Sequence, residues 1–88
     1  MKPNAIMVNP ADNVAVALED IGQGEEVRVG EKVLCRTIAD IAYSHKVLLK
    51  DLSEGEDVIK YGEIIGQAAQ DLKQGEWVHT HNLTLKGE

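Results

Sequence analysis

The chain has 88 residues, a formal net charge of −6 and one cysteine, and 43% of its residues are hydrophobic. This length suffices for one domain with a small aliphatic core. The negative charge argues against nucleic-acid binding, and the single cysteine excludes an internal disulfide and fits the cytoplasm. No apolar run approaches the roughly 18 residues of a membrane span, and the N-terminus lacks a signal-peptide pattern. We therefore expect one cytoplasmic domain over residues 1–88 without a membrane partner.

A short residue pattern recurs three times and divides the chain. Aspartate, isoleucine or leucine, two residues, Gly-Glu, one residue and valine occur at 20–27, 51–58 and 71–78. We expect each copy to form a compact corner, in which the aliphatic residue enters the core, the glycine takes a positive φ and the valine begins a strand. The uneven spacing of the copies argues against a solenoid.

Short strands are predicted before, between and after these corners. A tight hairpin is expected at Gly30 and Glu31, whereas residues 37–43 fit either a short helical turn or an irregular loop. With eight glycines and little helical periodicity, the chain is predicted to be all-β with at most short helical turns. The expected strands cover residues 6–8, 13–18, 26–29, 32–36, 45–49, 58–61, 64–66 and 77–85.

The expected last strand carries two of the three histidines, His79 and His81. Residues two apart in a strand share a face and lie about 6.5–7 Å apart. Such a pair can bind a metal, clamp an anion or act in acid–base catalysis. The alternative is two exposed surface histidines, and two ligands are too few for a zinc site. His45 is a candidate third imidazole, but its neighbour Lys46 would point to the opposite face.

A second group of ionisable residues comprises Lys60, Tyr61 and Glu63 around a glycine. Lysine offers a positive charge to a carboxylate substrate, and tyrosine offers a directional hydroxyl. The alternative is a β-bulge with ordinary surface charges. Asp12 fits either an Asx-turn or a ligand-facing loop, and Cys35 is expected in the core rather than as a nucleophile.

Four segments carry a family resemblance: 12–18, 44–47, 58–66 and 78–83, of which Lys-Tyr-Gly-Glu and Val-His-x-His-Asn are the most specific parts. Together they resemble the N-terminal SAF-type domain of the altronate/galactarate dehydratase family, whose relatives include sulfolactate sulfo-lyase. The resemblance spans nearly the whole chain, with the motif-bearing core at about 9–85. The family commonly has glycine where this chain has Ser44.

The resemblance implies a compact β-clip fold and a role in carbohydrate-acid catabolism. The dehydratases convert altronate or galactarate into 2-keto-3-deoxy acids with a divalent metal, typically Fe²⁺ or Mn²⁺, and the sulfo-lyases eliminate sulfite. The implied catalytic residues are His45, Tyr61, His79 and His81. The implied substrate-binding residues are Lys46, Lys60 and Asn82, and the implied metal ligands are His79 and His81.

The family's SAF domain accompanies a much larger catalytic domain, which this chain lacks. We therefore expect the small subunit of a two-chain sugar-acid lyase, inactive alone, with a large catalytic subunit as partner and an anionic sugar acid as substrate. Self-association is a further option. The alternatives are a sulfolactate sulfo-lyase-type subunit, a non-catalytic ligand-binding module as in sialic acid synthases and ice-binding proteins, or a structural cap on the large subunit. Clustered histidines favour the lyase over an ice-binding face, which would carry few ionisable groups.

Overall fold

A computed structural model describes residues 2–85, which contain nine short strands and no helix. The all-β prediction is therefore confirmed, and residues 37–43 adopt the irregular alternative. No segment of this described range is a helix long and apolar enough to cross a bilayer. The strands are β1 (Ala5–Ile6), β2 (Val14–Ala17), β3 (Glu26–Val29), β4 (Lys32–Arg36), β5 (Lys46–Leu48), β6 (Asp57–Lys60), β7 (Glu63–Ala68), β8 (Trp77–Val78) and β9 (Leu83–Thr84).

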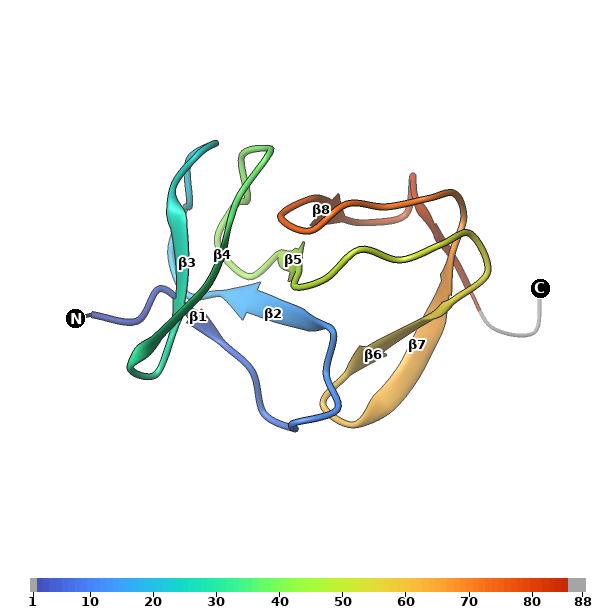
Figure 1. Cartoon of the computed structure of the whole chain (residues 1–88), viewed down its shortest axis with the longest axis horizontal. Coiled ribbons are helices and arrows are strands. Elements are labelled where there is room, and N and C mark those ends of the chain that lie inside the picture. Colours follow the sequence, from blue (N-terminus) through green and yellow to red (C-terminus); the bar gives the residue numbers. More distant parts are fainter. Residues whose placement is uncertain (1, 86–88) are drawn as a thin grey trace.

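The strands form three antiparallel sheets (Figure 1). A central sheet has the order β1-β2-β5-β8, and the β3–β4 hairpin and the β6-β7-β9 sheet lie at opposite ends of the domain. The hairpin predicted at Gly30 and Glu31 is confirmed, since Val29 pairs with Lys32 across it. The central sheet thus connects two hairpin units that do not pair with each other.

Strand β2 separates two hydrophobic cores. Ala15 and Ala17 belong to the core beside β3 and β4, whereas Val14 belongs to the core beside β6 and β7. The two alanines of β2 therefore pack into one core, and Val14 packs into the other. Leu18, which the predicted strand over 13–18 includes, follows the end of β2 and is 46% exposed.

All three predicted corners are present, and the structure adds a fourth. Gly24, Gly55 and Gly75 take φ values of 86°, 88° and 91°, as the pattern requires. The fourth corner, at 40–47, has the same aspartate, isoleucine and valine positions, but Ser44 stands at the glycine position with φ 68°. His45 stands where the other corners have glutamate.

The four corners associate in two pairs. An isolated β-bridge joins Ile21 to Ile41, and another joins Leu52 to Leu72. In each corner the aspartate accepts a hydrogen bond from a backbone N–H of the partner corner, so each pair is linked twice. These bonds run from Tyr43 to Asp20 (2.9 Å), Gln23 to Asp40 (2.9 Å), Gln74 to Asp51 (2.8 Å) and Glu54 to Asp71 (2.9 Å).

A buried asparagine fixes each hairpin to the central sheet. Each asparagine side chain donates to one backbone carbonyl and accepts from a backbone N–H two residues further on, where the hairpin register shifts. Both the nitrogen and the oxygen of each buried amide therefore have a hydrogen-bond partner, as their burial requires. The bonds join Asn4 to Glu26 and Arg28, and Asn13 to Asp57 and Ile59, at 2.7–2.9 Å.

Two corner glycines with similar φ values should respond differently to alanine. A Cβ at Gly75 would lie 2.2 Å from the carbonyl oxygen of Arg36, whereas a Cβ at Gly55 would meet nothing within 4 Å. We expect Gly55→Ala to lower the free energy of unfolding by about 1 kcal/mol through backbone strain alone, and Gly75→Ala to lower it by roughly twice that or more. Urea unfolding followed by circular dichroism measures both, and equal losses would contradict the packing at Gly75.

Candidate functional site

The strand predicted over 77–85 is interrupted, and the placement of His79 and His81 on one strand face is wrong. Strand β8 ends at Val78, and residues 79–82 form a turn in which the Asn82 N–H donates to the His79 carbonyl at 3.1 Å. The chain then leaves the central sheet and β9 pairs with β7. Both histidines therefore lie in a turn between two sheets.

Asn82, implied as a substrate-binding residue, holds this turn together. Its side-chain oxygen accepts the His79 N–H at 2.9 Å, and its side-chain nitrogen donates to the Trp77 carbonyl at 2.9 Å. The residue is only 2% exposed. The buried amide of Asn82 therefore shapes the histidine turn.

Trp77 is the centre of the histidine cluster, which consists of His45, Trp77, His79 and His81. The His79 ring stacks on the indole, with centroids 5.1 Å apart and an interplanar angle of 12°. The His81 and His45 rings lie tilted at 5.0 Å and 5.6 Å from the indole centroid. His45 and His79 also contact each other at 5.3 Å. The structure thus brings all three histidines to one side chain, including His45 as the third imidazole.

A hydrogen bond between side chains ties His45 to Trp77. The indole Nε1–H donates to Nδ1 of His45 at 3.0 Å. The other ring nitrogen of His45, and those of His79 and His81, have no hydrogen-bond partner among residues 2–85. In that range the one fully buried side-chain polar atom without a partner is Glu76 Oε2. The remaining imidazole nitrogens therefore reach solvent and are available to a ligand.

The fourth corner explains how His45 comes to face Trp77. At the equivalent position, Glu56 accepts the Ser53 N–H of its own corner at 2.7 Å, and Glu25 caps Gly22 in the same way. An imidazole replaces that carboxylate at His45, and its ring turns to Trp77 across the pairing of β5 with β8. Trp77 is the functional candidate that sequence reasoning missed. Aligning 40–47 with the other corners would have marked His45 as the position that departs from the pattern.

Trp77 also lines two shallow hollows, of which the second also includes His81. The first is lined with Trp77 by Asp20, Ile21, Gly22, Asp40, Ile41 and Ala42. The second is lined with Trp77 by Ile38, Ala39, Gln70, Glu76, His81 and Asn82.

Lys46 does not belong to the histidine cluster. It pairs with Val16 and Val78 in the central sheet, and alternation along β5 directs it away from the face of His45. Burial lowers the pKa of the Lys46 ammonium, and the positive charge of Lys60 lowers it further. The two lysines are therefore close enough to interact and form a local cationic region.

Lys60 and Tyr61 mark the turn between β6 and β7. Tyr61 is 46% exposed and takes a φ of 54°, and the Lys60 Nζ lies 5.0 Å from the centre of its ring. This geometry is a cation–π contact on an exposed turn. Within the described chain Tyr61 makes no ring contact with the three histidines. The turn lies beside the β1–β2 loop, at the edge of the central sheet opposite β8 (Figure 1).

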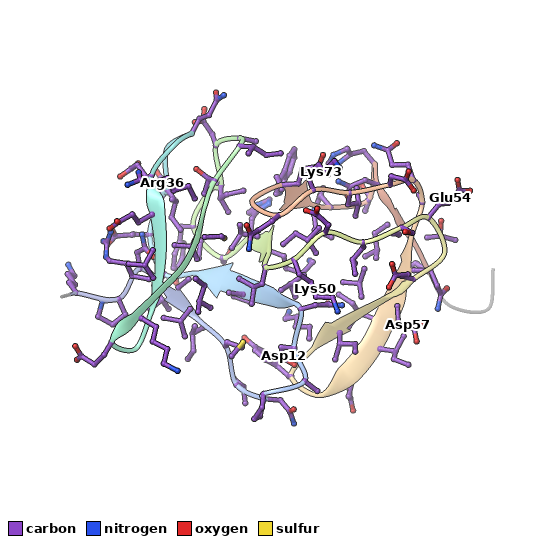
Figure 2. The ribbon with its side chains drawn as sticks, in the orientation of Figure 1. Asp12, Arg36, Lys50, Glu54, Asp57 and Lys73 are labelled. Carbon is purple, nitrogen blue, oxygen red and sulfur yellow. The ribbon has the colours of Figure 1, made fainter. Side chains whose placement is uncertain are left out.

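Asp12, labelled in Figure 2, anchors this turn. Its two carboxylate oxygens accept the Gly62 N–H at 2.7 Å and the Asn9 N–H at 3.2 Å, whereas the Asx-turn in this loop is made by Asn9, whose side-chain oxygen accepts the Ala11 N–H at 2.8 Å. Although burial opposes ionisation, the surrounding backbone N–H groups, led by that of Gly62, lower the pKa of Asp12 below its ordinary 3.8. Asp12 is thus a charged brace between the loop and the hairpin turn.

The described residues do not by themselves complete a metal site. No group of three or more His, Cys, Asp or Glu side chains in residues 2–85 is placed to hold an ion. His45 Nδ1 is occupied by the Trp77 N–H, and His79 and His81 supply only two imidazoles. Since protein zinc sites take at least three protein ligands, further ligands would have to come from elsewhere in an assembled enzyme.

The fold and the histidine cluster define a compact all-β module that presents imidazoles at one sheet edge. Its family follows from comparison with family models. Residues 3–86 match the altronate/galactarate dehydratase SAF domain, and the chain belongs to this family. The resemblance seen in the sequence motifs is therefore confirmed.

Curated relatives include enzymes and an enzyme subunit. The chain is 44% identical to altronate dehydratase of Escherichia coli over 77 residues, and 34% identical to its galactarate dehydratase (L-threo-forming) over 80 residues. These alignments cover 88% and 91% of this chain but 15% of each dehydratase, so the chain spans a small part of their length. It is also 52% identical to (2R)-sulfolactate sulfo-lyase subunit alpha of Paracoccus pantotrophus over 48 residues, 54% of this chain and 72% of that subunit.

Replacing the charged brace should destabilise the domain in a pH-dependent way. Asp12→Asn removes the anion that accepts two backbone N–H groups, so we expect a loss of about 1–2 kcal/mol in unfolding free energy at neutral pH. Because the folded-state pKa is lowered, this stabilisation is present above pH 3.8 and disappears as pH falls through the folded pKa. Urea unfolding across this range measures the difference.

The matched control is Asp57→Asn, which changes an exposed carboxylate that bonds the Gln67 side chain at 3.0 Å. We expect it to alter the unfolding free energy by no more than about 0.5 kcal/mol. A loss for Asp12→Asn that persists undiminished in acid would show that the charge of Asp12 is not the cause.

Proposed function

We propose that this chain is the small subunit of a cytoplasmic sugar-acid dehydratase and contributes imidazoles to an active site completed by a large catalytic subunit. The observation that carries the proposal is the convergence of three histidines on Trp77, with ring nitrogens open to solvent, in a member of the dehydratase SAF family. The proposed substrates are altronate- or galactarate-type acids, and the products are 2-keto-3-deoxy acids. Neither nucleic acid nor membrane is a proposed partner.

The proposed chemistry suits these residue types. Removing water from a hydroxy acid needs a base for the proton beside the carboxylate and an acid for the departing hydroxyl. Imidazoles perform both roles near neutral pH. His79 and His81 lie on one short turn, so a substrate docked there by the large subunit could meet both rings. Acid–base catalysis by positioned groups typically accelerates such steps by about 10²–10⁴-fold.

Lys46, Lys60 and Tyr61 are proposed to serve a separate surface at the β6–β7 turn. Two neighbouring ammonium groups attract a carboxylate even on an acidic protein. Lys60 and Tyr61 lie at the turn between β6 and β7, and Lys46 points to the sheet face opposite His45, which favours a role in holding an anionic group of the substrate or of the large subunit rather than in proton transfer. Self-association of this chain is compatible with either role.

A divalent metal, Fe²⁺ or Mn²⁺, is proposed for the assembled enzyme and not for this chain alone. His79 and His81 are the proposed contributors from this chain, because their rings have no other polar partner among the described residues. A metal would supply electrophilic assistance to the departing hydroxyl. The remaining ligands are assigned to the large subunit.

A second candidate is a sulfolactate sulfo-lyase-type small subunit. The 52% identity to a sulfo-lyase subunit alpha, of which the alignment covers 72%, favours it. Both candidates place an elimination from a hydroxy acid at the same histidines. They differ in the leaving group, which is water in one case and sulfite in the other, so product analysis separates them.

The test is to co-express this chain with a large dehydratase catalytic subunit that co-purifies with it and to assay altronate, galactarate and sulfolactate. We expect turnover from the complex and none from the 88-residue chain alone. His79→Ala and His81→Ala should each lower kcat by about 10²-fold or more. Thr80→Ala, an exposed position in the same turn, is the matched control and should change kcat less than about twofold.

Full activity of the complex with both histidines replaced would identify the chain as a structural cap. Turnover by the chain alone would overturn the two-subunit proposal. Binding of a sugar acid by the chain, measured by calorimetry, without turnover in any complex would favour a non-catalytic binding module.

A further inference from the structure

We infer that Trp77 is a positioning residue that holds His45 in the tautomer with its proton on Nε2, so that His45 acts toward a ligand as a hydrogen-bond donor. The inference begins from the 3.0 Å bond between Trp77 Nε1 and His45 Nδ1. An indole nitrogen can only donate. Nδ1 of His45 must therefore offer a lone pair, and in the neutral ring the proton resides on Nε2.

The surroundings of the ring keep this arrangement in place. His45 is half-buried beside the stacked pair of Trp77 and His79, and its ring centroid lies 5.6 Å from that of the indole and 5.3 Å from that of His79. The pairing of Val47 with Trp77 fixes the two backbones that carry the bond. A ring flip would remove the acceptor from the indole N–H and leave that donor without a partner in a half-buried position, which is unfavourable.

The backbone of the fourth corner leaves His45 free for this role. The His45 N–H donates to the Ala42 carbonyl at 3.0 Å, and the His45 carbonyl accepts the Ala17 N–H at 2.9 Å. These bonds reproduce those of Glu76, whose N–H donates to the Lys73 carbonyl and whose carbonyl accepts the Leu48 N–H. The corner thus needs no side-chain cap from His45, and its ring is available to bond Trp77 instead.

The bond to Trp77 limits the chemistry that Nε2 of His45 can perform. An Nε2 that carries hydrogen has no lone pair in the ring plane, so it can neither ligate a metal nor accept a proton while the bond to Trp77 persists. It can donate to an anionic oxygen, such as a carboxylate or a departing hydroxyl. This assignment of a ligand class rests on the proposed function, whereas the tautomer itself does not. Within the cluster, His79 and His81 are left as the rings that can act as base or ligand.

The first experiment reads the tautomer in the isolated full chain. Two-bond proton–nitrogen correlation spectra of the ¹⁵N-labelled protein in alkaline buffer should show His45 with a protonated Nε2 and a bare Nδ1. In Trp77→Phe, which keeps an aromatic ring but removes the donor, His45 should become a mixture of tautomers. His79→Ala, which removes the stacked ring but keeps the donor, is the control and should retain the single tautomer. A protonated Nδ1 in the unaltered protein, or a single Nε2–H tautomer in Trp77→Phe, would overturn the inference.

A second measurement does not depend on the folding of Trp77→Phe. In His45→Ala the indole N–H loses its acceptor, so its hydrogen exchange should accelerate by at least about tenfold relative to the unaltered chain. Unchanged exchange would show that the bond is not formed in solution. Both readouts use this chain alone, so they succeed or fail independently of any lyase activity.

The donor role is then tested in the assembled enzyme. Glutamine presents a side-chain N–H close to the place of Nε2, whereas alanine presents none. We expect His45→Gln to retain at least about tenfold more kcat/KM than His45→Ala, a difference of about 1.4 kcal/mol in transition-state binding. Equal activities of the two variants would overturn the donor role and leave the tautomer result standing.

Discussion

The fold depends on reciprocal hydrogen bonds between the paired corners. In each pair of corners, the aspartate of one corner accepts a backbone N–H of the other, and a β-bridge joins the aliphatic residues that follow the aspartates. A domain of this size buries little surface and has few regular strands longer than five residues. Charge-assisted bonds to backbone groups are among the stronger ones available to it. These hydrogen bonds hold the corners in fixed pairs, and the corners in turn set the directions of the strands that follow them.

This repeated device also explains where the chemistry is located. Three corners keep both glycine and glutamate, and the fourth replaces them with Ser44 and His45. The aspartate bonds and the bridge at Ile41 persist in the fourth corner, so its backbone is unchanged while its side chain is released from capping. The histidine turn follows β8, the edge strand of the central sheet that carries Trp77 and pairs with β5. A structural repeat with one altered copy thus produces a localised cluster of ionisable rings.

Much of the fold was readable from the sequence, and the reasons for the exceptions are physical. Glycine marks three corners because they require a positive φ, and in two of them Glu25 and Glu56 also cap the corner. The hairpin at Gly30 likewise contains a glycine with positive φ. The sequence pattern does not reveal the fourth corner because Ser44, and not glycine, has the positive φ there. The hydrogen bonds between the two paired corners hold Ser44 in this conformation. The last strand was extended too far because alternation of residue types does not reveal that the Asn82 amide would cap its own turn. The family motifs indicated the three histidines that lie together in the structure, but not the tryptophan that they contact, because the contact between His45 and Trp77 is made across the pairing of β5 with β8.

The only tryptophan of the chain lies at the centre of the histidine cluster. Its indole has a stacked imidazole, two tilted ones and a hydrogen bond from its own nitrogen. Tryptophan fluorescence from this protein therefore originates at a single place, without background from other indoles. Docking of a large subunit, entry of a small anion or rearrangement of the rings would each alter the colour or intensity of that emission. The molecule carries an intrinsic optical probe at the position where its function is expected.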